Sequence, residues 1–202
     1  MEQKGVTIWF TGMSGTGKTA LAIRLEEELR GRGLKVERLD GDIVRQSLTR
    51  DLGFSKEDRD KNIERVTFVA KLLTRNGVAV LCSFISPYRR VRANVRREVE
   101  NFVEVYCHAP LETLIERDVK GLYKKAIAGQ IENFTGISDP YEVPESPEVM
   151  IDSSTETVEE SLARVLGTLE ALGYVPSVGQ ETVYSADEEA EIEARLAALG
   201  YL

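Results

Sequence analysis

Short apolar segments alternate along the chain with segments of helical periodicity. The apolar segments are 6–11, 36–39, 78–84, 102–107 and 149–151. Strands that alternate with helices join through right-handed crossovers into a parallel sheet with helices on both faces. The pattern therefore predicts a three-layer α/β fold with a five-stranded parallel sheet, and its ligands are expected beyond the carboxyl ends of the strands.

Several predicted helices carry their own start and stop signals. In the first of them, leucines recur at four-residue spacing, which is typical of a helix that buries one face. A Ser-x-x-Asp and a Thr-x-x-Glu capping box precede two others. The predicted helices are 18–32, one that begins after Ser55 and ends near Gly77, and one from Thr157 to Leu172.

Two stretches depart from this alternation. Residues 130–148 hold one glycine and three prolines with little apolar periodicity, which is typical of a functional loop or lid. After Val175 a polar linker leads to residues 185–202, whose pattern is that of an acidic amphipathic helix. We predict a main domain over residues 1–175 and an extension over 176–202, whose helix either repeats a common helix ending or docks onto a partner.

The composition and charge limit the partners. The chain has 26 Lys and Arg against 34 Asp and Glu, a net charge of −8, and 42% hydrophobic residues. A chain of this composition can bury a core, and its acidic balance argues against broad contact with nucleic acid or an anionic membrane. We expect its partners to be small molecules or proteins.

Cysteine usage and hydropathy favour the cytoplasm. Cys82 and Cys107 both lie in apolar segments, where free thiols serve as small hydrophobes, so a reducing compartment fits. The apolar run near the N-terminus, residues 6–11, is too short for a signal sequence. No apolar stretch approaches the roughly 20 residues of a membrane span.

A glycine-rich loop carries the strongest chemical signal. Residues 12–19 read Gly-Met-Ser-Gly-Thr-Gly-Lys-Thr and match G-x-x-x-x-G-K-[ST] between a predicted strand and a predicted helix. In such a loop, backbone N–H groups surround the β-phosphate, Lys18 reaches the β- and γ-phosphate oxygens, and Thr19 ligates magnesium. We predict binding of a nucleoside triphosphate with Mg²⁺; the alternative is a merely glycine-rich turn.

Two carboxylates favour a small-molecule kinase. Asp40 and Asp42 follow the second predicted strand, beside the loop, where they can orient a nucleophile and hold magnesium. No Asn-Lys-x-Asp guanine-reading segment follows a later strand, and residues 130–148 can close as a lid that excludes water. We expect Asp42 to orient or deprotonate the acceptor hydroxyl with support from Asp40. A plain Asp-Gly turn, and Asp152 as the carboxylate instead, are the alternatives.

The residues after Asp42 suit an adenylated anion as acceptor. Arg45, Phe54, Arg59 and Asn62 follow it before the third strand. Arg59 and Asn62 share one face of the predicted helix, and together with an aromatic ring they offer an anion ligand, an amide and a surface for a purine. The alternative for Arg59 is an exposed ion pair, because charged residues of both signs flank it.

Later segments add candidates for the acceptor site and for the lid. Ser86 follows the third strand and precedes Pro87, so it is either the N-cap of the next helix or a site residue at a strand end. Farther along, Arg117 and Lys120 lie in a basic segment before residues 130–148 and can clamp phosphate charge, while Phe134 can close over a base.

Taken together, these segments resemble the adenylylsulfate kinase (APS kinase) family over about residues 5–175. The segments that carry the resemblance are 12–19, 40–42, 51–55 with Asp58, Arg59 and Asn62, 84–89, 120–126 and 134–137. The resemblance implies a P-loop nucleoside triphosphate hydrolase-like fold. It also implies transfer of the γ-phosphoryl group of ATP, with Mg²⁺, to the 3′-hydroxyl of adenosine 5′-phosphosulfate (APS) in sulfate assimilation. A cytoplasmic homodimer that works after ATP sulfurylase is implied as well.

The motifs and the resemblance together predict roles for individual residues. The predicted catalytic residues are Asp42, Lys18, Asp40 and Ser86, and the predicted metal-side residues are Thr19 and Asp42. The donor would be bound by Gly12, Ser14, Gly15, Thr16, Gly17, Lys18, Thr19, Ala20 and Arg117. The acceptor would be bound by Asp42, Arg45, Phe54, Arg59, Asn62, Ile85, Ser86, Lys120, Leu122 and Phe134. The family has been assigned a phosphoserine at the position of Ser86, but no base is evident beside it, so we expect direct in-line transfer.

Two departures from the family pattern keep alternatives open. Ile43 stands where the family usually has Asn, which removes one possible hydrogen bond to the substrate. The extension over residues 176–202 passes the family's usual end. The alternatives are a P-loop kinase for another small nucleotide or alcohol, and a non-catalytic nucleotide-binding regulatory module.

Overall fold

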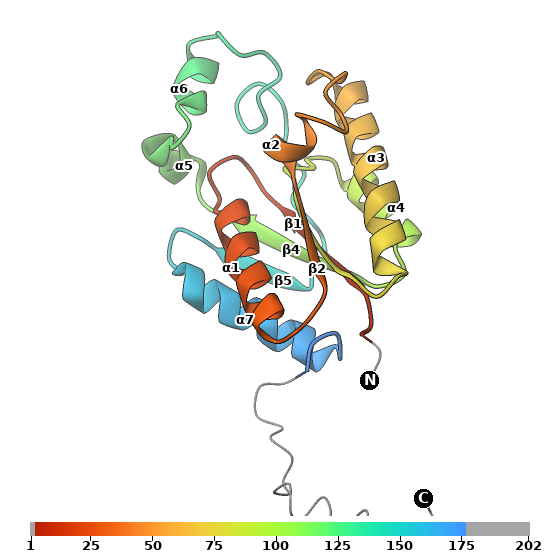
Figure 1. The fold of residues 1–202 in the computed structure, drawn as a ribbon. Coiled ribbons are helices and arrows are strands. Elements are labelled where there is room, and N and C mark those ends of the chain that lie inside the picture. Colours follow the sequence, from red (N-terminus) through yellow and green to blue (C-terminus); the bar gives the residue numbers. More distant parts are fainter. Residues whose placement is uncertain (1–2, 177–202) are drawn as a thin grey trace, which may run out of the picture.

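The computed structural model describes residues 3–176, and a five-stranded parallel sheet forms its centre (Figure 1). The strands lie in the order β2-β3-β1-β4-β5, and every neighbouring pair is parallel. Their bounds are β1 (Val6–Thr11), β2 (Val36–Asp40), β3 (Ala79–Ser83), β4 (Phe102–His108) and β5 (Val149–Asp152). The predicted fold class is confirmed, and each predicted strand end lies within one residue of the observed one.

Helices cover both faces of the sheet, as the alternating pattern predicts. Figure 1 shows α1 and α7 on one face and α3 and α4 on the other. The helices are α1 (Lys18–Gly31), α2 (Gly41–Val44), α3 (Lys56–Thr74), α4 (Arg89–Glu98), α5 (Leu111–Arg117), α6 (Leu122–Ile127) and α7 (Val158–Ala171). None of the helices in this described part of the chain is long and apolar enough to cross a membrane.

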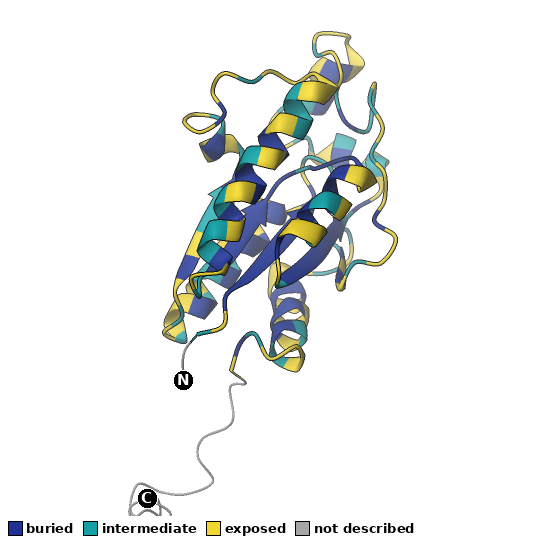
Figure 2. Ribbon diagram, turned by 90° about the vertical axis from the view of Figure 1, so that its right-hand side faces the viewer, coloured by how far each residue is buried: buried dark blue, intermediate teal, exposed yellow. Residues whose placement is uncertain are grey.

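The sheet divides the interior into two large hydrophobic cores, and a third, smaller cluster of buried side chains lies around α5 and α6. Ile8 and Phe10 of β1 point into the core under α1 and α7, whereas Trp9 between them points into the core under α3 and α4. This division follows from the strand geometry, because successive side chains point to opposite faces. Figure 2 shows the resulting pattern, with buried strands and helices that are buried on one side only. Cys82 and Cys107 are buried free thiols within these cores.

Two predicted caps are present, one of them in a modified form. Thr157 and Glu160 make both arms of a capping box at the start of α7. At the start of α3, the Ser55 hydroxyl accepts from the Asp58 N–H, but the Asp58 carboxylate accepts from the Gly53 N–H instead of the Ser55 N–H. The side chain of Asp58 therefore closes the preceding loop, and the helix keeps a single-sided cap.

The remaining departures lie near the carboxyl ends of the strands. Helix α2, one short turn capped by Asp40, has no periodic signal in the sequence. Residues 130–148 contain neither helix nor strand apart from an isolated bridge between Thr135 and Asp139, so the absence of regular structure predicted there is confirmed. We call residues 130–148 the excursion. The helix predicted for residues 185–202 lies outside the described residues.

Candidate active site

One cleft lies at the carboxyl end of the sheet, where the topology places ligand sites. It has a volume of about 560 Å³ and is lined by residues from the glycine-rich loop, from the ends of β2 and β3, and from α3, α6 and the excursion. In Figure 1 this is the end of the molecule that carries α2 and α6, away from the N-terminus. Segments far apart in the sequence therefore meet around one space.

The glycine-rich loop places a helix N-terminus against the cleft. Gly15 and Gly17 adopt left-handed backbone conformations, and Gly17 precedes α1 without a side-chain cap. The first N–H groups of α1 have no intrahelical partner, and this end of the helix carries partial positive charge. Gly15, Gly17, Ser14 and Ala20 all line the cleft, as predicted for a phosphate-binding loop.

Lys18 is buried at the centre of this loop. Its ammonium donates to the carbonyl oxygens of Gly12 at 2.8 Å and Met13 at 2.7 Å. Burial lowers the pKa of Lys18 to about 8. A phosphate group at this position would restore the charged form, because an adjacent negative charge favours the ammonium.

Two of the predicted donor residues shape the loop instead of lining the cleft. Gly12 has a φ of 144°, and a Cβ there would lie 2.1 Å from the carbonyl oxygen of Cys107, so only glycine fits. The buried Thr16 hydroxyl donates to the Met13 carbonyl at 2.9 Å. Both residues fix the backbone whose N–H groups face the cleft.

The two carboxylates of the Asp-Gly-Asp segment have different surroundings. Asp40 is buried and accepts from the Thr19 hydroxyl at 2.8 Å and from the Asp42 N–H at 2.9 Å. Asp42 is exposed and pairs with Lys120 at 2.6 Å. The competing candidate, Asp152, caps a turn at the edge strand β5 and does not line the cleft. Asp40 therefore lies on the side of the loop, and Asp42 faces across the cleft.

The side of the cleft opposite the loop contains the predicted acceptor residues. The Arg45 guanidinium lies 4.3 Å from the centre of the Phe54 ring, which is 62% exposed. Asn62 is buried and accepts from the Thr49 hydroxyl at 2.7 Å. An exposed aromatic face with a guanidinium behind it is suited to stack on a flat base.

Arg59 binds the excursion rather than solvent. Its guanidinium donates to Asp139 at 2.9 Å and to the Thr135 hydroxyl at 2.7 Å, and it also contacts the Asn133 carbonyl. Asp139 accepts a further hydrogen bond from the Tyr88 hydroxyl at 2.9 Å. The alternative of an exposed ion pair is wrong for Arg59, because its side chain is 13% exposed and its carboxylate partner, Asp139, lies far along the chain.

Ser86 adopts a strained turn after β3. Its φ is 40°. Its hydroxyl accepts from the Trp9 indole N–H at 3.0 Å and donates to the Thr11 hydroxyl at 3.0 Å. Helix α4 begins only at Arg89, with Tyr88 as its N-cap. The N-cap alternative for Ser86 is therefore wrong, and the side chain is held inside the protein at the wall of the cleft.

The side of the cleft formed by α6 and residues 130–148 is built on Tyr123, a residue that the sequence does not single out. Its hydroxyl donates to the Ser14 carbonyl at 2.8 Å, and its ring meets Phe134 edge to face at 5.1 Å. Lys120, Leu122 and Phe134 line the cleft as predicted. The tyrosine lies in a basic segment with no distinctive spacing, so only its three-dimensional contacts reveal its role.

Some site residues were missed, and one predicted residue lies elsewhere. The cleft is also lined by Gly41, Ile63, Ser83, Phe84, Pro87, Leu114, Asp118, Val119, Tyr123 and Thr135. Their signal in the sequence is position alone, since most follow a strand or flank a predicted site residue. Arg117 does not line the cleft and donates to the Ser153 carbonyl at 2.8 Å. Across the described residues, no cluster of three or more His, Cys, Asp or Glu forms a metal cage.

Comparison with known proteins gives the family. The family model described as adenylylsulphate kinase matches residues 4–152. A probable adenylyl-sulfate kinase from Pseudomonas aeruginosa is 66% identical over 166 residues, which cover 82% of this chain and 78% of that protein. A probable bifunctional SAT/APS kinase 2 from Sorangium cellulosum is 56% identical over 181 residues, covering 90% of this chain and 31% of that protein.

A solved structure agrees in both fold and sequence. The Mycobacterium tuberculosis APS kinase CysC in complex with AMPPNP and APS superposes with a TM-score of 0.80. The two chains are 41% identical, and the match covers 83% of this chain and 99% of that one. The family model over residues 4–152 includes every segment that lines the cleft.

Proposed function

This chain belongs to the adenylylsulphate kinase family, and from that premise we propose the reaction of its cleft. The chain is an ATP-dependent kinase that transfers the γ-phosphoryl group to the 3′-hydroxyl of APS, giving 3′-phosphoadenosine 5′-phosphosulfate and ADP. The observation that carries this proposal is that the phosphate-binding loop and the wall with Phe54, Arg59 and Phe134 line the same cleft.

On the donor side, the loop binds the terminal phosphates of ATP. The N–H groups of Gly15, Gly17 and the start of α1 surround the β-phosphate, and Lys18 moves from the loop carbonyls to the β- and γ-phosphate oxygens. Arg117 remains a predicted contact of the donor nucleotide, because it lies on α5, whose Leu114 lines the cleft.

The residues beside the loop fit a magnesium ion. Thr19 and Asp40 are in contact, and the Ser83 hydroxyl, buried next to Asp40 across the β2–β3 pairing, has no hydrogen-bond partner in the described part of the chain. Magnesium prefers oxygen ligands, keeps several waters and is commonly held by one or two carboxylates plus substrate phosphates. When bound, the ion neutralises charge on the transferring phosphoryl group.

These contacts change one sequence prediction. We assign the metal side to Thr19, with Asp40 and Ser83 beside it, in place of Asp42. Asp40 is buried against Thr19, whereas Asp42 points across the cleft to Lys120. When phosphate is bound, the Lys120 ammonium leaves the Asp42 carboxylate and pairs with the phosphate. Asp42 is then free to orient the 3′-hydroxyl and to accept its proton.

On the acceptor side, Phe54 and Phe134 stack on the adenine, and Arg59 binds the anionic group. The exposed ring of Phe54 and the excursion held by Arg59 support this arrangement. Ile43 is 54% exposed and does not line the cleft, so its difference from the family pattern affects acceptor binding little.

The transfer is direct, without a phosphoserine intermediate. The Ser86 hydroxyl lies between Trp9 and Thr11, with no carboxylate or imidazole among its hydrogen-bond partners. A serine nucleophile needs a base within hydrogen-bond reach. The loop and Asp42 instead hold donor and acceptor for in-line attack, in which positioning supplies much of the rate.

A coupled ADP-release assay tests the function. We expect ADP release to require Mg²⁺ and to be much faster with APS than with AMP or with water alone. Equal rates with APS, AMP and water would overturn the proposal, and faster release with a different alcohol would favour a kinase of other specificity. No release with any acceptor, together with intact ATP binding, would indicate a regulatory module.

A pair of variants tests the assignment of Asp42. Asp42→Asn should lower turnover by about 100-fold, as expected when a positioned general base is lost, and leave ATP binding measurable. The matched control is Asp152→Asn, which changes a carboxylate at the end of β5, outside the cleft. Normal turnover in Asp42→Asn would contradict its role.

The partners follow from the same reaction. We propose that the enzyme takes APS from ATP sulfurylase, which is supported by a relative that joins SAT and APS kinase in one name. Two buried, unpaired cysteines support a reducing cytoplasm as its location. The homodimer stays a prediction, for which light scattering of the purified full chain is the test.

A further inference from the structure

Arg92 of α4 is a buried charge that the proposed reaction does not use. Its side chain is 3% exposed, and its Nε pairs with Glu104 of β4 at 2.9 Å, a carboxylate that is itself buried. Removing two charges from water is costly, and such a pair often stabilises a fold no more than apolar residues do. The role of the pair follows from the contacts of the two terminal nitrogens of the guanidinium, Nη1 and Nη2.

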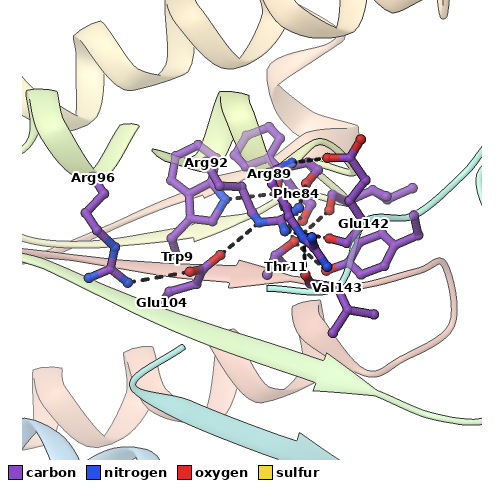
Figure 3. Close-up of polar contacts among 12 residues, drawn as sticks. Trp9, Thr11, Phe84, Arg89, Arg92, Arg96, Glu104, Glu142 and Val143 are labelled. Atoms are coloured by element: carbon purple, nitrogen blue, oxygen red, sulfur yellow. Dashed lines mark hydrogen bonds and ion pairs between the residues drawn. The ribbon is translucent and has the colours of Figure 1, made fainter. Parts of the chain in front are cut away.

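The guanidinium joins two segments of the cleft that are far apart in the sequence. Nη1 donates to the Ser86 carbonyl at 2.6 Å, and Nη2 donates to the Glu142 carbonyl at 2.6 Å. Ser86 lies in the turn after β3, and Glu142 lies in the excursion. Figure 3 shows Arg92 between Glu104 on one side and Glu142 on the other. The ring of Tyr141 covers the guanidinium, 5.6 Å from its centre.

The turn that Arg92 holds is strained. A serine at a φ of 40° is in a sparsely populated region, which costs on the order of 1–3 kcal/mol unless the surroundings impose it. Three groups impose it here: the Trp9 indole, the Thr11 hydroxyl and the Arg92 guanidinium. Strain held by its surroundings is found where backbone geometry matters for binding.

We propose that Arg92 is a positioning residue for the acceptor. Fixed by Glu104, its guanidinium holds the turn 85–87 against the excursion, so that both sides of the acceptor subsite keep one geometry. This inference rests on the proposed function, because it takes that turn as an acceptor wall. Lysine cannot substitute for the arginine, since an ammonium lacks the planar fork that reaches three partners at once.

The test compares Arg92→Lys with Arg96→Lys in the full chain. Arg96 lies one helical turn away and contacts the same Glu104 at 3.5 Å (Figure 3). Its other carboxylate partner is Glu148, and it does not contact the turn. Arg92→Lys should raise the KM for APS about 10-fold, the equivalent of one lost buried hydrogen bond, and change the KM for ATP less than 2-fold. Arg96→Lys should change neither constant.

Trp9 supplies a second measurement that needs no turnover. It is the chain's one tryptophan, it is buried, and its indole N–H binds the Ser86 hydroxyl. We expect the emission maximum of the ligand-free protein to shift in Arg92→Lys and to stay unchanged in Arg96→Lys. Tyr141→Phe, which removes only the hydroxyl bonded to Thr11, serves as a milder variant if Arg92→Lys fails to fold, with a smaller rise in the same KM.

The outcomes separate this inference from the function on which it rests. An unchanged KM for APS with unchanged Trp9 emission overturns the positioning role. Equal increases in both KM values indicate a general loss of structure and also overturn it. If the wild type fails to phosphorylate APS, the proposed function fails. The emission of Arg92→Lys then still decides whether the arginine holds the turn.

Discussion

Asp40 makes two contacts in this structure, and two substitutions can distinguish its capping role from the metal-side role that we propose for it. One carboxylate oxygen caps α2 by accepting from the Asp42 N–H, and the other accepts from the Thr19 hydroxyl on the metal side. Asparagine is as good an N-cap as aspartate but carries no charge, whereas alanine provides neither feature. Asp40→Asn therefore isolates the charge.

The structure sets the expected magnitudes. Loss of an N-cap costs about 1 kcal/mol, so Asp40→Ala should lower the free energy of unfolding by about that amount, while Asp40→Asn should change it less. Both variants should lower kcat about 100-fold, because a preorganised charge beside the transferring phosphoryl group is lost. They should also require more Mg²⁺ for half-maximal rate, since Asp40 is the buried carboxylate next to Thr19.

Urea denaturation and ADP release over a range of Mg²⁺ concentrations measure the two effects. Thr19→Ser is the control, because it keeps the hydroxyl that contacts Asp40. An Asp40→Asn protein with wild-type kcat and wild-type Mg²⁺ dependence would refute the metal-side role. A loss of stability in Asp40→Asn as large as in Asp40→Ala would refute the separation of the two functions.

Three further predictions test the loop and the core. ATP affinity should fall as the pH rises through about 8, because the pKa of Lys18 is about 8 and the ammonium then loses its proton. Calorimetry at pH 7 and at pH 9 measures the affinity, and Lys18→Arg should show no such fall. Gly12→Ala should abolish ATP binding or folding, as its Cβ would lie 2.1 Å from a carbonyl oxygen; circular dichroism with nucleotide titration checks it, and a normal Kd would contradict the clash. Thr7→Val should lower the free energy of unfolding by about 1–3 kcal/mol, because it leaves the buried Thr74 hydroxyl unpaired. In urea denaturation, the double variant Thr7→Val with Thr74→Val should lose less stability than the sum of the two single variants.

The features that the sequence predicts well are those set by nearby residues. The leucine spacing of α1, the Thr157 cap of α7 and the loop before Lys18 all depend on residues within a few positions, and all are present. The order of strands and helices also fixes the edge of the sheet at which Asp40 and Ser86 meet the loop.

The features that the sequence does not predict depend on distant partners. Ser86 looks like an N-cap because Pro87 follows it, but its backbone is set by Trp9 and by Arg92. Arg59 sits among local charges, yet it binds Asp139, 80 positions away. Local pattern cannot distinguish an exposed arginine from one that a distant carboxylate holds, and the same limit applies to Tyr123.

The two hydrophobic cores on either side of the sheet have a consequence for how such an enzyme can diverge. The loop that grips the donor leads into α1 on one core, whereas much of the acceptor wall is carried by α3 and by the turn before α4 on the other. Strands β1, β3 and β4 contribute side chains to both cores, whereas the helices each pack on one side. Substitutions that change acceptor specificity can therefore accumulate in the core under α3 and α4, while the core under α1 and the phosphate-binding loop stay unchanged. Such an enzyme can change the alcohol that it phosphorylates and keep the same binding site for the donor.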